Sequence, residues 1–152
     1  MKPLPEVENA KQLMHEAMKW SVMTWLREKK RVRKTADQAN AALDRLSQEL
    51  KQRWPKPLRT SYEALAAQKS AAKANGRSRE QGNGKESVDS AMARKLREAD
   101  DQALHARMLA EETFDEAERK LSTSLAREGC LKAIQSWDLQ EQAIVHSEKC
   151  AG

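Results

Sequence analysis

The residues that interrupt helices are scarce in this chain, and they are gathered in a few places. Its four prolines stand at positions 3, 5, 55 and 57, and three of its five glycines lie between residues 76 and 84. Proline and glycine are the least favourable residues in a helix interior, so the stretches between these places are free to form long helices. More than half of the residues are Ala, Glu, Lys, Leu or Arg, a composition typical of long helices.

These breakers divide the sequence into three predicted helices and one flexible loop. We expect helices over residues 6–53, 61–74 and 88–149, with the glycine-rich loop at residues 75–87. The capping box at residues 60–63 and the serine at position 87 are suitable starts for the second and third helices. The sequence therefore predicts an all-α chain in which residues 1–152 form a single elongated helical domain.

The second half of the first predicted helix carries an apolar stripe with the spacing of a coiled-coil seam. Its members, three and four positions apart, are Val32, Ala36, Ala39, Leu43, Leu46 and Leu50. The first two predicted helices together are about as long as the third. We therefore expect a long antiparallel, coiled-coil-like helical hairpin whose outgoing arm is kinked at Pro55 and Pro57. In this register residues 13–26 lie opposite residues 131–146.

The apolar stripe of the third predicted helix shifts its phase between Ala117 and Leu125. Three consecutive hydroxyl residues, 122–124, lie at the same place. We interpret the shift as a local relaxation of supercoiling within one continuous helix. Gly129 is the other weak point, because glycine costs a helix about 1 kcal/mol relative to alanine.

The paired ends of this hairpin hold more apolar residues than a seam between two helices can bury. The expected protein-contact patch comprises Leu13, Met18, Trp20, Trp25, Leu26, Ile134, Trp137 and Ile144. Through it we expect the chain to dimerise into a four-helix bundle or to bind a protein partner, as a non-enzymatic scaffold, adaptor or structural subunit would. The alternative is that the tryptophans only fill the thick end of the hairpin itself.

A dense basic segment offers a second hypothesis for function. Six of the eight residues from 27 to 34 are cationic, namely Arg27, Lys29, Lys30, Arg31, Arg33 and Lys34. Phosphate contacts from such groups would give salt-sensitive nucleic-acid binding without sequence preference. Aromatic residues that could stack on unpaired bases are missing around the segment. A solvated basic face, or one that meets an acidic protein surface, is the simpler interpretation of mixed charge on a helix.

No pattern in the sequence indicates catalysis, a cofactor or a small-molecule substrate. The residues three positions before the three histidines are Gln12, Gln102 and Ala143, which excludes the Glu-x-x-His pattern of di-iron bundles. The one arrangement that could hold zinc joins His15 with His146 and Cys150, which lie opposite each other in the expected hairpin. The structural alternative is that these are ordinary residues near helix ends, so we expect no metal site.

The remaining features favour a cytoplasmic location. The two cysteines are too few for a disulfide framework, and the N-terminal residues lead directly into charged sequence without the pattern of a signal peptide. No apolar run approaches the roughly 18 residues that a membrane span requires.

Overall fold

The computed structural model describes residues 4–75 and 87–151 of the chain. Every regular element within this part is a helix. The helices are α1 (Pro5–Ala17), α2 (Val22–Gln52), α3 (Lys56–Asn75), α4 (Val88–Lys120) and α5 (Thr123–Ala151). The predicted all-α class is therefore confirmed. The predicted loop lies mostly outside the described residues.

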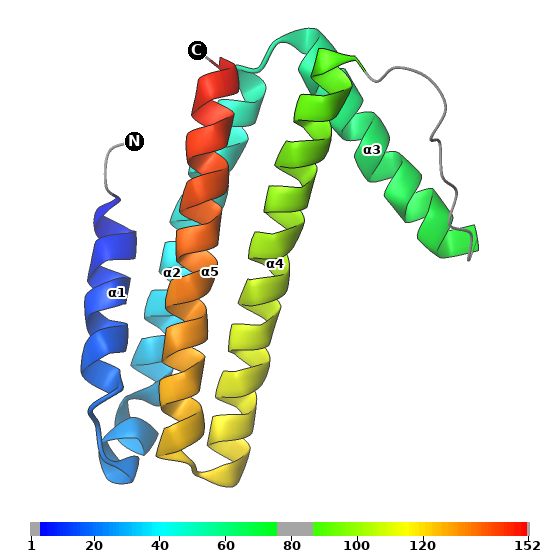
Figure 1. Ribbon diagram of the computed structural model, residues 1–152. Coiled ribbons are helices and arrows are strands. Elements are labelled where there is room, and N and C mark those ends of the chain that lie inside the picture. Colours follow the sequence, from blue (N-terminus) through cyan, green and yellow to red (C-terminus); the bar gives the residue numbers. More distant parts are fainter. Residues whose placement is uncertain (1–3, 76–86, 152) are drawn as a thin grey trace.

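The first long helix is not continuous, contrary to the prediction. Helix α1 ends at Ala17, and α2 begins after Ser21, whose hydroxyl oxygen accepts a hydrogen bond from the Thr24 backbone N–H at 3.3 Å. Helix α1 folds back beside α2 instead of extending it (Figure 1). The physical reason is burial. A straight helix would leave much of the apolar surface of residues 13–26 in water, whereas the fold-back buries Leu13 and Trp25.

The predicted third helix is also broken, at Leu121 and Ser122. Leu121 adopts the left-handed helical conformation with φ 51° and ψ 49°, which ends α4. The Ser122 hydroxyl accepts a hydrogen bond from the Leu125 backbone N–H at 3.2 Å and so caps the start of α5. The phase shift in the apolar stripe therefore marks a reversal of the chain, and the interpretation as one continuous helix is wrong.

Helices α1, α2, α4 and α5 form a bundle, and α3 leaves it at an angle (Figure 1). Helices α4 and α5 are antiparallel, with Thr113 hydrogen-bonded to Lys132 and Arg107 to Gln140. Helix α5 runs in the same direction as α2, and α1 lies on the other side of this pair. The predicted hairpin of two long rods is therefore replaced by a tight hairpin of α4 and α5.

The core of the bundle is built around two aromatic residues from different helices. The rings of Trp25 and Phe114 stack with their centroids 5.9 Å apart. Gly129 of α5 lies against this pair, and a Cβ atom there would be only 2.7 Å from the Phe114 ring. The glycine therefore lets α5 approach the Phe114 ring closely, so it has a packing role that its position in a helix did not predict.

Helix α3 begins at Lys56, five residues earlier than predicted. The first turn of a helix tolerates proline because its N–H groups have no intrahelical partner, so Pro57 does not delay the start. The described part of α3 is fixed to the bundle by a second apolar cluster, in which Trp54, Leu58 and Tyr62 pack with Ala93 and Leu96 of α4.

Candidate functional site

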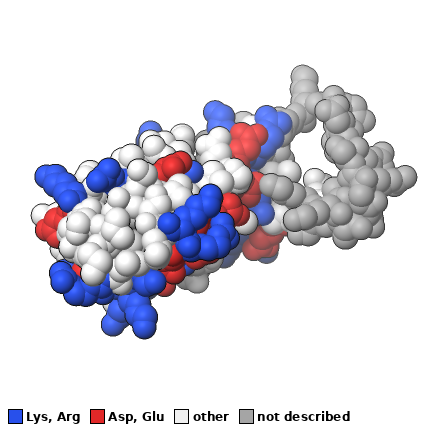
Figure 2. Space-filling view, turned by 90° about the horizontal axis from the view of Figure 1, so that it is seen from below, with Lys and Arg blue, Asp and Glu red and all other residues white. Residues whose placement is uncertain are grey.

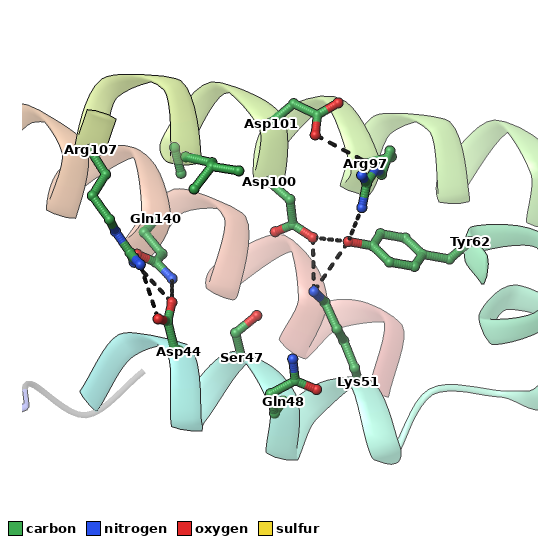
Figure 3. A pocket seen from close by; sticks show the side chains of 12 residues that line it. Asp44, Ser47, Gln48, Lys51, Tyr62, Arg97, Asp100, Asp101, Arg107 and Gln140 are labelled. Carbon is green, nitrogen blue, oxygen red and sulfur yellow. Dashed lines mark hydrogen bonds and ion pairs between the residues drawn. The ribbon is translucent and has the colours of Figure 1, made fainter. Parts of the chain in front are cut away.

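A polar groove runs between α2 and α4, with α5 forming its floor and α3 closing one end (Figure 3). Its volume is about 310 Å³. The side chains along it are Asp44, Ser47, Gln48 and Lys51 of α2, Tyr62 of α3, Arg97, Asp100, Asp101, Ala103, Leu104 and Arg107 of α4, and Gln140 of α5. The groove exists because long charged side chains, in place of short apolar ones, bridge α2 and α4 at this level.

Tyr62 is the centre of a hydrogen-bond network at the closed end of the groove. Its hydroxyl donates a short hydrogen bond to the Asp100 carboxylate and accepts one from the Lys51 ammonium group at 3.2 Å. Lys51 also forms an ion pair with Asp100 at 2.9 Å. The Arg97 guanidinium lies on the other side and donates to the same hydroxyl at 3.5 Å. Three helices are thereby joined at a single phenol group (Figure 3).

The surroundings of Lys51 and Tyr62 keep both groups protonated. Burial by itself lowers the pKa of Lys51, but the charge and hydrogen bond of Asp100 outweigh it, so the pKa is raised above 10.5. Burial and the hydrogen bond to Asp100 both raise the pKa of Tyr62 above 10.0. Neither group is poised to act as a base or a nucleophile near neutral pH, because both roles require the deprotonated form.

A second network lies about two helical turns along the groove, since Asp44 and Arg107 are each seven residues from a member of the first network. The Arg107 guanidinium donates two hydrogen bonds to the Asp44 carboxylate, at 3.0 and 2.9 Å, and a third to the Gln140 side-chain oxygen at 2.6 Å. The Gln140 amide donates to Asp44 at 2.8 Å. Burial raises the pKa of Asp44, but the hydrogen bonds from Arg107 and Gln140 outweigh it, and the net shift is downward.

The groove is balanced in charge, and the apolar side chain of Leu104 lies along it. The residues along it include three cations and three carboxylates, which are paired with one another. Leu104 and Met108 of α4 are four residues apart, so they share one face of the helix, and their exposed fractions are 53% and 52%. A surface of this kind suits a ligand with both apolar and polar groups better than a simple anion.

The groove was not predicted from the sequence, because its residues come from four helices. The only local signal was Tyr62, the single tyrosine in a chain with few aromatic residues. Tyr62 was predicted to lie in a capping box at the start of a helix, whereas it lies in the second turn of α3.

Comparison with known proteins adds no assignment. No protein family, no curated protein and no solved structure matches the chain.

The predicted protein-contact patch is largely inside the molecule. Leu13, Trp25, Trp137 and Ile144 are buried in the bundle core. Met18, Trp20, Leu26 and Ile134 are partly buried and pack against the same core. The expectation of an exposed patch is therefore wrong for the four buried residues, because the fold-back of α1 and the α4–α5 reversal bury them within one chain.

The basic segment lies on α2, and the structure divides its cations into two groups. Arg33 faces α4 and forms ion pairs with Asp115 at 3.0 Å and Glu118 at 3.7 Å, and its guanidinium also lies over the Phe114 ring. Lys29 is half-buried, whereas Arg27, Lys30, Arg31 and Lys34 are exposed. Arg33 therefore has a structural role. Among the exposed cations, Arg27 and Arg31 lie 3.7 and 3.9 Å from the Glu28 carboxylate.

The residues of the conceivable zinc site are not assembled. His15 of α1 and His146 of α5 are exposed, and no group of three metal-ligating side chains comes together within residues 4–75 and 87–151. Burial raises the pKa of Cys150, and it raises the pKa of the buried Cys130 to about 12. Both cysteines therefore carry neutral thiols near neutral pH.

None of the described helices is long and apolar enough to span a membrane.

Proposed function

We propose that this chain is a non-enzymatic helical scaffold or adaptor, and that the groove between α2 and α4 receives a helical segment of a protein partner. The observation that carries the proposal is the exposed apolar pair Leu104 and Met108, of which Leu104 lines the charge-balanced groove and Met108 follows one turn later on α4. An amphipathic partner helix presents apolar residues at the same spacing of three and four positions, with polar residues beside them.

The energetics of the groove suit reversible binding to a specific partner. Leu104 and Met108 are each about half exposed, so covering them contributes about 1 kcal/mol apiece. Two such contacts are too weak for tight binding by themselves. The paired charges of the groove fix which polar groups a partner can place there, because an unmatched buried charge is costly.

The proposal of a non-enzymatic role is supported by the chemistry of the groove. Its nucleophilic candidates, Lys51 and Tyr62, are held in their protonated forms by Asp100 and by burial. Asp44 is fully engaged by Arg107 and Gln140. Groups held in this way stabilise a binding surface, whereas a general base needs a free lone pair directed at a substrate.

The proposal can be tested by photo-crosslinking in the cells that produce the protein. A photoreactive amino acid is placed at Gln48, which is exposed on the α2 side of the groove. We expect a discrete protein adduct that disappears when Leu104 and Met108 are both changed to Lys. The matched control is Leu131→Lys, which introduces the same charge at a similarly exposed leucine on α5, away from the groove.

Each outcome of this experiment has a defined meaning. An adduct that survives the double substitution, or that is lost equally in the Leu131 control, contradicts the proposal. An adduct with twice the mass of the chain identifies the partner as a second copy. Circular dichroism of the purified variants shows whether each one retains its helices.

Nucleic-acid binding through α2 is the second candidate, and the exposure of Lys30 and Lys34 favours it. These two lysines are four residues apart on one helix face, and no ion pair to either is formed within the described residues. Binding to duplex DNA should then weaken steeply with salt, with a logarithmic slope of about 0.9 per phosphate contacted. A flat salt dependence, or full binding by the variant K30E/K34E, contradicts this candidate.

A further inference from the structure

One end of the bundle exposes several apolar side chains. At this end, the lower one in Figure 1, lie both the α1–α2 and the α4–α5 connections. Met23 is 75% exposed and Leu121 is 56% exposed, Val22 is also exposed, and Trp20 is half-buried beside them. Seen from this end, most of the surface in the middle is uncharged, and Lys and Arg side chains lie around it together with some Asp and Glu side chains (Figure 2). We call these four residues the apolar end.

The backbone conformation at position 121 does not favour leucine. Its φ of 51° lies in the left-handed region, which disfavours residues with a Cβ atom and is usually occupied by glycine or asparagine. A leucine at this position is less favourable for the fold, and more than half of its side chain is in water. The left-handed conformation and the exposure of the side chain are both unfavourable in the isolated chain. Contact of the Leu121 side chain with an apolar environment would remove the cost of its exposure to water.

Positive charge predominates in the two segments that form the apolar end, and carboxylates begin in the adjoining turns with Glu28, Glu118 and Glu128. The two connecting segments, residues 18–27 and 119–127, contain no carboxylate. Their five cations are Lys19, Arg27, Arg119, Lys120 and Arg127, and all are exposed. Arg27 pairs with Glu28 at 3.7 Å, Lys120 pairs with Glu116 of the neighbouring turn, and Arg127 donates to the Met18 carbonyl oxygen. No ion pair to Lys19 or Arg119 is formed within the described part of the chain. The charge complementarity therefore points to an anionic partner.

The size of the end helps to identify the class of partner. A helix with its side chains is about 10–12 Å across, so the end of a four-helix bundle covers roughly 500 Å². A stable protein–protein interface of typical size covers about 800 Å² on each side. A lipid bilayer has no such requirement, because separate apolar side chains enter its interfacial region while cations around them contact the lipid phosphates.

We propose that the apolar end docks onto an anionic lipid membrane, with Met23 and Leu121 entering the interfacial region and Lys19 and Arg119 contacting lipid headgroups. The bundle then stands on the membrane by this end. The groove between α2 and α4 lies along the side of the bundle and stays accessible. This inference does not depend on the function proposed for the groove.

The test is cosedimentation of the full chain with lipid vesicles at low salt. One set of vesicles is pure phosphatidylcholine, and the other contains phosphatidylserine in addition. We expect binding to the anionic vesicles only, and a loss of about tenfold or more in affinity for the variant M23S/L121N. Asparagine tolerates the left-handed conformation at position 121, so this variant keeps its fold.

Two further variants identify the forces involved. V88S removes an apolar side chain that is 83% exposed at the opposite end of α4, so it should bind like the unaltered chain. K19E/R119E should bind anionic vesicles more weakly and with a smaller dependence on salt.

Three results would overturn the proposal: no binding to anionic vesicles at low salt, equal binding by M23S/L121N and the unaltered chain, or equal losses for M23S/L121N and V88S. Binding to duplex DNA that is insensitive to Met23 and Leu121, together with no binding to vesicles, would assign the cations to nucleic acid instead.

Discussion

Replacing Gly129 by alanine sets two effects of similar size against each other. Alanine in a helix interior is favoured over glycine by about 1 kcal/mol. The added Cβ would lie 2.7 and 2.8 Å from two carbons of the Phe114 ring, well inside van der Waals contact. The ring is buried and stacked on Trp25, so it has little room to move. Overpacking of this kind costs about 1–3 kcal/mol, so we expect a net destabilisation of up to about 2 kcal/mol.

A double-mutant cycle separates the two effects. Phe114→Leu removes the ring edge that the new methyl group would meet, although this change is itself destabilising because it leaves a cavity. In the Phe114→Leu background, Gly129→Ala should be neutral or stabilising, since the helix preference for alanine then remains without the clash. The coupling between the two sites should therefore be about 1–3 kcal/mol.

Urea denaturation followed by far-ultraviolet circular dichroism measures all four proteins of the cycle. The slope of the transition should stay the same across the cycle, which shows that one cooperative transition is being compared. A rise in stability of Gly129→Ala in the unaltered background would refute the close approach of α5 to Phe114. Additive effects of the two substitutions would do the same.

Three further predictions concern the α4–α5 turn and the networks of the groove. Leu121→Gly should stabilise the fold by about 0.5–1 kcal/mol, because glycine adopts the left-handed conformation without a steric penalty; a loss of stability on denaturation would contradict this. Tyr62→Phe should destabilise by about 1–2 kcal/mol and increase hydrogen exchange in α3, because Asp100 and Lys51 lose a buried partner; unchanged exchange would show that the phenol group does not hold α3. The pKa values of Lys51 and Tyr62 are both raised by folding, so their contribution to stability is complete below about pH 10 and is lost as the pH rises through the folded values. The pKa of Asp44 is lowered, so its contribution is present above about pH 4 and is lost in acid, and denaturation midpoints measured across the pH range would test both signs.

Several features of the fold follow from local sequence, and the structure confirms them. The scarcity of breakers and the apolar periodicity predicted an all-α chain. Ser87 was predicted to start a helix, and its hydroxyl accepts a hydrogen bond from the Ser90 backbone N–H at 3.0 Å. These features depend on residues within a turn or two of one another, so they can be read from the sequence.

The two chain reversals could not be predicted in this way, although each leaves a trace in the sequence. Ser21 is an N-cap residue, but a single serine occurs inside many helices, and the apolar residues around it obscured the break. At position 121 the residue type predicts that the helix continues, because leucine is a strong helix former and disfavours the left-handed conformation that Leu121 adopts. What decides both breaks is the burial gained when the chain folds back, and that gain depends on residues distant in the sequence.

By itself the sequence determined that this protein is helical and which helix faces are apolar. The tertiary structure decided where the long helices break, that Trp25 and Trp137 pack inside one chain, and that Lys51, Tyr62, Asp100 and Arg97 meet in a groove. The physical reason is that hydrogen bonds within a helix depend on near neighbours, whereas the burial of apolar surface depends on which helices pack together. The same apolar stripe can be buried by a long hairpin or by a folded bundle, and only the packing distinguishes them.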